Sequence, residues 1–125
     1  MILDTNALSA IADGDPAAAA CIAGAPLVAI PVIVLGEYRY GIARSRLRVE
    51  YERWLDESLP ACRVLAVSEE TASAYAAVRA ELEQAGTPIP ANDLWIAALC
   101  RQHRLPILSQ DEHFDVVRGV RRVGW

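Results

Sequence analysis

The stretch that decides the fold is MILDTN, residues Met1 to Asn6. Three apolar residues run directly into Asp4, a pattern that predicts a short buried strand with a carboxylate at its end. In open α/β sheets, ligands bind beyond the carboxyl ends of the strands, so we interpret Asp4 as a candidate ligand-binding residue. The alternative is a capping role, because Asp4, Thr5 and Asn6 are all favourable residues at a helix N-terminus.

Segments typical of strands and helices alternate along the rest of the chain. Further strands are expected at 27–30, 63–67 and 106–109, with a possible edge strand at 121–123. Helices are expected at 7–12, 17–23, 31–45, 47–59, 68–84, 92–103 and 113–118. This alternation predicts a single α/β domain over residues 1–125, with a central, mainly parallel β-sheet flanked by α-helices on both faces.

Composition and charge limit the possible functions. A chain of 125 residues with a net charge of −4 is one domain and is not a uniformly basic nucleic-acid clamp. Its basic residues are all Arg, which excludes mechanisms that depend on Lys and leaves guanidinium groups suited to phosphate. The three Cys have no CxxC spacing, so neither a disulfide framework nor a zinc site is indicated and a reducing cytoplasm is expected.

The uncharged stretch from Pro16 to Gly36 is long enough to suggest a membrane span. Proline and glycine interrupt it, and β-branched residues are concentrated in its second half, so we interpret it as a helix end, a strand and a helix start. Asp13 and Asp15 stand where a signal peptide would need positive charge. No membrane segment is therefore expected.

Three further carboxylates stand out. Glu37 lies on an apolar helix face without an intrahelical cation, which a solvated surface position would not predict. Asp93 opens the most apolar helix, where either it or Asn92 could instead serve as the cap. Asp111 follows the strand that ends at Ser109, so it emerges at a strand end as Asp4 does. Asp115 lies one helical turn further on, where a surface charge is the simpler interpretation.

Several carboxylates that meet at one edge of a sheet repel each other, and a divalent metal relieves that repulsion. Oxygen ligands without a Cys/His cluster favour Mg²⁺ or Mn²⁺ over zinc. Such ions coordinate phosphate oxygens and activate water, so hydrolysis of phosphodiester bonds is the expected chemistry.

Four motifs in register carry a family resemblance: LDTN at Asp4, LGEYRYG around Glu37, NDLWIAA at Asp93 and LSQDEHF at Asp111. Together they resemble the PIN-domain nucleases, and most closely the toxin component of VapBC-type toxin–antitoxin pairs. The resemblance covers essentially the whole chain. It implies a hydrolase of the EC 3.1 class, a Mg²⁺- or Mn²⁺-dependent endoribonuclease that inhibits translation as a toxin and leaves a 3′-hydroxyl and a 5′-phosphate.

The resemblance also assigns roles to residues. Asp4, Glu37, Asp93 and Asp111 match the catalytic, metal-binding acidic quartet of the family. Asp115 falls where some members carry an additional acid and is held as a possible metal ligand. Asn6 and Ser109 match supporting polar residues. The partners that the resemblance implies are an RNA substrate, a cognate antitoxin, and a second copy of the chain in a homodimer or in a hetero-oligomer with the antitoxin.

RNA binding needs local positive charge. Arg39, Arg44 and Arg48 lie on or just after the Glu37 helix and are candidate contacts to RNA phosphates. Arg48 has Glu52 as a competing partner, whereas Arg44 has none at helical spacing. For His113, a helix-start or packing role is preferred over that of a general base, because water activated by a metal needs no imidazole.

Three alternatives to the toxin reading remain open. A housekeeping PIN nuclease would share the chemistry, and a catalytically silent binding domain would share the fold. A receiver-type phospho-acceptor domain also gathers acids at strand ends, but it relies on a Lys, which this chain lacks.

Overall fold

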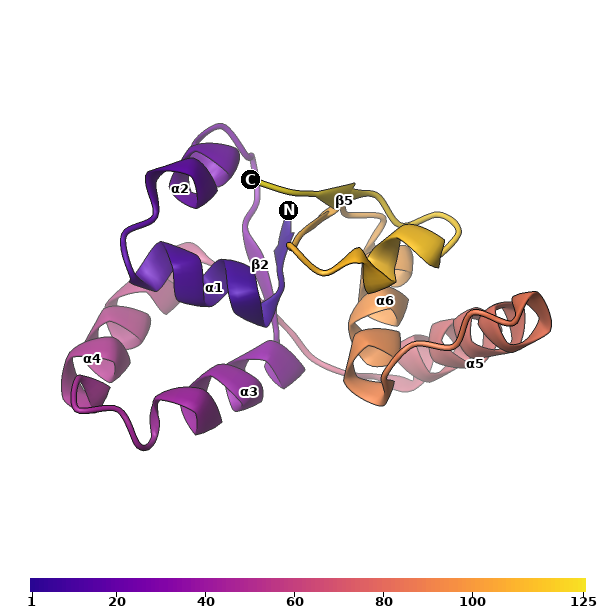
Figure 1. Cartoon of the computed structure of the whole chain (residues 1–125), viewed down its shortest axis with the longest axis horizontal. Coiled ribbons are helices and arrows are strands. Elements are labelled where there is room, and N and C mark those ends of the chain that lie inside the picture. Colours follow the sequence, from indigo (N-terminus) through magenta and orange to yellow (C-terminus); the bar gives the residue numbers. More distant parts are fainter.

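The computed structural model describes all of residues 1–125 (Figure 1). Its strands are β1 (Ile2–Leu3), β2 (Ala29–Pro31), β3 (Arg63–Leu65), β4 (Ile107–Leu108) and β5 (Arg122–Val123). They form one five-stranded sheet in the order β3-β2-β1-β4-β5. Every neighbouring pair is parallel, which confirms the predicted parallel α/β sheet.

The helices lie on both sides of this sheet. They are α1 (Thr5–Ala12), α2 (Pro16–Ala23), α3 (Val32–Ile42), α4 (Arg48–Ser58), α5 (Glu69–Ala85) and α6 (Ala91–His103), with short 3₁₀ helices η1 (Leu59–Ala61) and η2 (Glu112–Val116). In Figure 1, α1, α2 and α4 lie to the left of β2, α3 lies below it, and α5 and α6 lie to its right. None of these helices combines the length and the apolar composition that crossing a bilayer requires.

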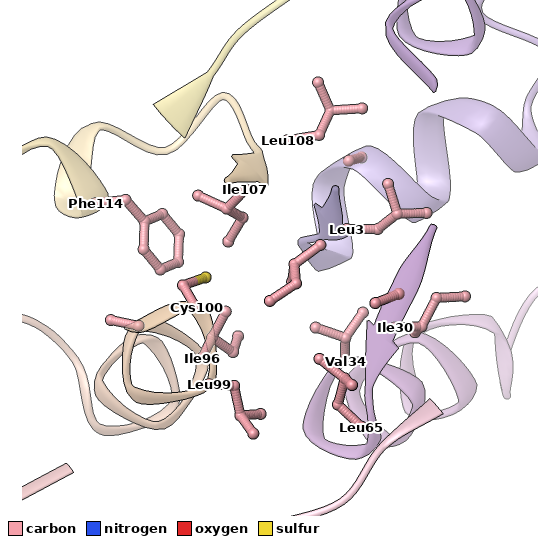
Figure 2. Close-up of a cluster of buried hydrophobic side chains, with 14 of the residues drawn as sticks. Leu3, Ile30, Val34, Leu65, Ile96, Leu99, Cys100, Ile107, Leu108 and Phe114 are labelled. Carbon is pink, nitrogen blue, oxygen red and sulfur yellow. The ribbon is translucent and has the colours of Figure 1, made fainter. Parts of the chain in front are cut away.

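One hydrophobic core joins the two sides of the sheet. Figure 2 shows side chains from β1, β2 and β4 in one cluster with those of α3 and α6. Ile96 and Leu99 of α6 are fully buried, and so is Phe114 of η2. Burial of Phe114 fixes the segment that follows β4 against the core. This segment carries the carboxylates of Asp111 and Asp115.

The position of β1 at the centre of the sheet brings distant residues together. β1 pairs with β4 in the register Ile2 to Ile107 and Leu3 to Leu108. The next residues, Asp4 and Ser109, therefore leave neighbouring strands side by side at the carboxyl edge of the sheet. This is the edge where parallel α/β sheets bind ligands.

Several local predictions need correction. Pro31 ends β2 and precedes α3, rather than lying in the first turn of that helix. The helix predicted over 47–59 begins at Arg48, and Leu47, which is 46% exposed, lies before it. The segment after Asp111 forms a 3₁₀ turn rather than a helix over 113–118, and β3 ends at Leu65 rather than at residue 67.

Candidate active site

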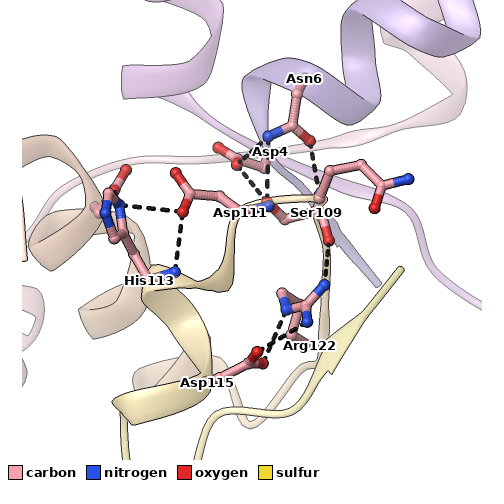
Figure 3. A network of polar contacts seen from close by, with 9 residues as sticks. Asp4, Asn6, Ser109, Asp111, His113, Asp115 and Arg122 are labelled. Atoms are coloured by element: carbon pink, nitrogen blue, oxygen red, sulfur yellow. Dashed lines mark hydrogen bonds and ion pairs between the residues drawn. The ribbon is translucent and has the colours of Figure 1, made fainter. Parts of the chain in front are cut away.

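Asp4 is a buried carboxylate at the end of β1, with only 5% of its surface exposed. It is the N-cap of α1, and its Oδ1 accepts a hydrogen bond from the Thr5 backbone N–H at 2.8 Å. The predicted alternative of capping thus holds for Asp4 itself. Its second oxygen, Oδ2, accepts from Ser109 Oγ at 2.6 Å and from Asn6 Nδ2 at 3.0 Å (Figure 3).

Ser109 links Asp4 to the segment after β4. It is fully buried, and its Oγ accepts the Asp111 backbone N–H at 2.9 Å while donating to Asp4. Asn6 adds a second link, because its Oδ1 accepts the Gln110 backbone N–H at 3.2 Å. The two supporting residues therefore fix the position of the Asp111 loop relative to Asp4.

Glu37 lies on α3 and reaches the same edge of the sheet. Its Oε2 accepts a hydrogen bond from Thr5 Oγ1 at 3.2 Å, and its Oε1 accepts from Asn92 Nδ2 at 3.1 Å. The Glu37 carboxylate has no cation, as the sequence indicated; two neutral donors, from the starts of α1 and α6, hold it instead. The sequence offers Asn92 and Asp93 as alternative caps of α6, but that helix has no side-chain cap, and Asn92 donates to Glu37 instead.

Asp93, Asp111 and His113 form the closest cluster of potential metal ligands. One ligand atom from each lies within 4.8 Å of the other two. The imidazole Nδ1 of His113 lies 2.9 Å from Asp93 Oδ2 and 3.1 Å from Asp111 Oδ1 (Figure 3). Neither Asp4 nor Glu37 belongs to this cluster, and they are connected to its neighbourhood through Ser109 and Asn92.

The pKa values reflect crowding of negative charge. Burial is the main reason that the pKa of the Asp93 carboxyl is raised; the hydrogen bond with His113 opposes the rise, and the charges of Asp111 and Asp4 add to it. The same hydrogen bond raises the pKa of the His113 imidazole. A protonated His113 thus offsets part of the repulsion between the two carboxylates.

The donor chemistry of the cluster fits a divalent cation. Asp93 and Asp111 each bind His113 through one oxygen and keep the other carboxylate oxygen free of protein partners. Anionic oxygens that crowd one site are stabilised by a positive charge placed between them. Carboxylates are the ligands of hard cations such as Mg²⁺ and Mn²⁺, although the imidazole also admits other metals.

The remaining candidates lie outside this cluster. Asp115 forms a bidentate ion pair with Arg122, with both N–O distances at 2.8 Å, and so is held by a guanidinium. Arg39 pairs with Asp56 at 3.4 Å and Arg48 with Glu52 at 3.1 Å. Among the three arginines proposed for RNA contact, Arg44 alone has no carboxylate partner.

Sequence reasoning missed the contacts of His113. The sequence favours a helix-start or packing role for His113. Half of the side chain is exposed and the ring binds two acids, so the packing role is wrong. The position of His113 at the start of η2 agrees with the expectation. The order Asp111, Glu112, His113 indicates the contact with Asp111, because an Asp that caps a short turn brings the residue two positions later close to its own carboxylate. The contact of Asn92 with Glu37 depends on how close α3 and α6 lie to each other, which no local sequence pattern encodes.

Comparison with known proteins places this architecture in a family. The family model for the PIN domain matches residues 1–120. The chain belongs to the PIN-domain family. This PIN domain is 32% identical to ribonuclease VapC5 of Mycobacterium tuberculosis, over 98% of the chain and 90% of that protein. It is also 33% identical to toxin FitB of Neisseria gonorrhoeae, over 67% of the chain and 65% of that protein.

Solved structures agree with this assignment. VapBC2 of Rickettsia felis, bound to a DNA fragment from its promoter, matches this PIN domain with a TM-score of 0.86 at 26% identity. The match covers 99% of this chain and 97% of that one. FitAcB of Neisseria gonorrhoeae matches with a TM-score of 0.84 at 28% identity, over 97% and 94% of the two chains.

Proposed function

We propose that this PIN domain is a metal-dependent endoribonuclease and the toxin of a toxin–antitoxin pair. The observation that carries the chemistry is the pair of free carboxylate oxygens on Asp93 and Asp111, next to the buried Asp4. Similarity to ribonuclease VapC5 over nearly the whole chain supports RNA as the substrate. Similarity to VapBC2 and FitAcB supports an antitoxin as partner, with a homodimer or a hetero-oligomer as the assembly.

In this proposal Asp4, Glu37, Asp93 and Asp111 hold the cation, which is Mg²⁺ or Mn²⁺. When bound, such an ion polarises the phosphoryl group and makes water a better nucleophile. Ser109 and Asn6 orient the Asp4 carboxylate through two hydrogen bonds to its Oδ2. Thr5 and Asn92 orient the Glu37 carboxylate from the ends of two different helices.

His113 has a positioning role in this mechanism. Its Nδ1 lies within hydrogen-bond distance of both Asp93 and Asp111, so the ring sets the separation of these carboxylates. A proton at Nδ1 can be donated to either carboxylate oxygen. Because the other oxygen of each acid stays free, the ring does not block the positions proposed for metal ligation.

RNA cleavage in vitro tests the catalytic proposal. We expect the purified protein to cut single-stranded RNA in the presence of Mg²⁺ or Mn²⁺, to leave 5′-phosphate ends, and to lose activity in EDTA. Asp93→Asn should reduce cleavage by about 100-fold or more while the circular dichroism spectrum is unchanged. Glu70→Gln, an exposed carboxylate change at the start of α5, is the matched control and should cut as the wild type does. Full activity of Asp93→Asn would disprove the assigned site.

Growth of a bacterial host tests the toxin proposal separately. Expression of the chain should arrest growth, and Asp93→Asn should abolish the arrest. Co-expression of the neighbouring reading frame should restore growth if that frame encodes the antitoxin. Cleavage in vitro without growth arrest would instead identify a housekeeping PIN nuclease.

A further inference from the structure

A basic cavity of about 460 Å³ lies at the edge of the sheet opposite the candidate active site. Pro106 precedes β4 and Arg121 precedes β5, and these strands are parallel, so both residues mark the amino edge of the sheet. The residues that line the cavity are Arg101, Arg104, Leu105, Pro106, Gly119 and Arg121. Half of its lining residues are therefore arginines.

Most of the positive charge at this cavity is not neutralised by a carboxylate. Arg101 binds Glu81 through two hydrogen bonds, of 3.0 and 2.8 Å. These bonds hold the pKa of the Glu81 carboxyl below its usual value, and the charge of Arg118 adds to this effect. Arg104, Arg118 and Arg121 are exposed and form no ion pair. The amino edge thus carries unpaired, accessible guanidinium groups in a chain of net charge −4.

The backbone of Arg104 adds an independent observation. Arg104 ends α6 in the left-handed conformation, with φ of 54° and ψ of 42°, and no other residue except glycine has a positive φ. Helices that end in this conformation usually have Gly there, because a side chain is strained. The α5 helix ends in this way, at Gly86. Arg104 costs stability at this position, which points to a function for its side chain.

A structural role explains only part of this arrangement. The dipole of a helix stabilises cations near its C-terminus, which accounts for Arg101 in the last turn of α6. This effect needs no side chain at the strained position of Arg104. It also does not explain Arg118 and Arg121, which come from the segment before β5. An anionic ligand accounts for all of these guanidinium groups.

We propose that this cavity binds a phosphate of the RNA backbone at a distance from the cut. Guanidinium groups match phosphate oxygens through paired N–H donors. The acids at the carboxyl edge repel phosphates until a cation is bound, whereas the amino edge attracts them with or without metal. Leu105 and Pro106 add an apolar wall for a ribose or a base. The choice of RNA as the ligand rests on the proposed ribonuclease function.

The position of the cavity determines which RNA can use it. The α6 helix carries Asp93 in its first turn and ends at Arg104. A rise of 1.5 Å per residue places the backbones of these two residues about 16 Å apart. A strand in a nucleic acid helix advances about 3.4 Å per nucleotide, so a helical RNA spans this distance with roughly five nucleotides. The enzyme should therefore prefer long or folded RNA to short oligonucleotides.

Binding in EDTA tests the cavity without cleavage. Fluorescence anisotropy with a labelled oligoribonucleotide of about 20 nucleotides should show saturable, salt-sensitive binding to the wild type. Arg104→Gln and Arg121→Gln should each weaken it about threefold to tenfold and lower the slope of log affinity against log salt by about 0.7. Arg63→Gln, an exposed arginine on the outermost strand β3, is the matched control and should change neither. Unchanged affinity in both cavity variants would overturn the proposal.

A glycine variant separates binding from folding. Arg104→Gly removes the charge and also the strain of a side chain in the left-handed conformation. The melting temperature should therefore stay the same or rise while the affinity for RNA falls. A lower melting temperature with unchanged affinity would show a merely structural role for Arg104 and contradict the proposal.

A competitor identifies the class of ligand. Unlabelled polyglutamate of the same length should displace the labelled RNA less well than unlabelled RNA does, because it brings no ribose or base to the apolar wall. Equal competition by polyglutamate would overturn the proposal in favour of an acidic protein partner.

Substrate length separates this inference from the proposed cleavage. Arg104→Gln should cut an oligoribonucleotide of about four nucleotides as fast as the wild type does, and a long RNA more slowly, because only the long RNA reaches the cavity. Binding that depends on Arg104, without any cleavage, would support the cavity and reject the nuclease. Cleavage of long RNA at equal rates by Arg104→Gln and the wild type, with equal affinities, would reject the cavity alone.

Discussion

Ser109 is fully buried, and its hydroxyl contacts three groups, two from the segment that follows β1 and one from the segment that follows β4. It donates to Asp4 Oδ2 at 2.6 Å and accepts from the Asp111 backbone N–H and the Asn6 side chain. The sequence indicates Asp4 as a strand-end carboxylate, and the family resemblance indicates Ser109 as a supporting residue. Their mutual contact follows from the parallel register of β1 and β4, which only the three-dimensional pairing sets.

Ser109→Ala should destabilise the protein by about 2 kcal/mol, because a hydrogen bond to a buried carboxylate is lost and Asp4 is left partly unsatisfied. Urea denaturation at pH 7 measures the change. Ser73→Ala, at an exposed site on α5, is the control and should alter the free energy of unfolding by less than about 0.5 kcal/mol. An equal, small effect at both sites would show that Ser109 does not support Asp4.

The ion pair of Asp115 and Arg122 makes a pH-dependent contribution. The hydrogen bonds from Arg122 hold the pKa of the Asp115 carboxyl below its usual value. A carboxyl whose pKa is depressed in the folded state stabilises that state above its unfolded pKa, and this contribution is lost as the pH falls through the folded pKa.

Asp115→Asn should therefore be less stable than the wild type near neutral pH, and the difference should disappear in the acid range below the usual Asp pKa of about 3.9. Urea midpoints for the two proteins across this pH range measure it. A difference that is the same at every pH would rule out the ionic contribution.

At the scale of elements, local signals placed α5 well and α6 less completely. The Ser68 capping box and the left-handed Gly86, with φ of 71°, mark the two ends of α5, close to the predicted helix over 68–84. The α6 helix begins without any side-chain cap, because Asn92 binds Glu37 and Asp93 binds His113. A local sequence pattern predicts partners that are near in the chain. It therefore does not predict the contacts of Asn92 and Asp93, whose partners are far away in the sequence.

Two glycine substitutions should have opposite effects. Gly86→Ala should cost about 1 kcal/mol, because L-residues are disfavoured in the left-handed conformation that ends α5. Gly36→Ala, at an exposed site within α3, should stabilise by up to about 1 kcal/mol because Ala is the better helix former. An added Cβ meets nothing within 4 Å at either site, so sterics do not complicate the comparison. Thermal or urea unfolding should give opposite signs, and effects of the same sign would contradict this account.

At the scale of the whole molecule, the proposed RNA binding has to be reconciled with a net charge of −4. Arg39 and Arg48 are already paired with carboxylates, whereas Arg44 is not. The sequence predicted competition for Arg48 from Glu52 four residues later. The pair between Arg39 and Asp56 joins α3 to α4 and was not predictable from spacing.

Arg44→Ala should therefore weaken RNA binding more than Arg48→Ala does. A lost phosphate contact lowers the slope of log affinity against log salt by about 0.7 for a single strand. Fluorescence anisotropy with a labelled oligoribonucleotide, over a range of salt concentrations, measures both the affinity and the slope. Equal slopes for Arg44→Ala and the wild type would remove Arg44 from the RNA-binding surface.

The fold class and the family motifs could be predicted because they depend on strand patterns and on residue order. The grouping of Asp93, Asp111 and His113 could not, since it depends on where α6 and η2 pack. The assignment of Asp4, Glu37, Asp93 and Asp111 as metal ligands stays a prediction. The geometry supports it through the free carboxylate oxygens of Asp93 and Asp111, whereas both oxygens of Asp4 and of Glu37 accept hydrogen bonds.

Direct measurement of Mn²⁺ binding tests that assignment without relying on activity. Titration of Mn²⁺, followed by its electron paramagnetic resonance signal, should show saturable binding to the wild type. Asp93→Asn should weaken the affinity by about tenfold or more, and Glu70→Gln should leave it unchanged. Equal Mn²⁺ affinity of Asp93→Asn and the wild type would contradict the account.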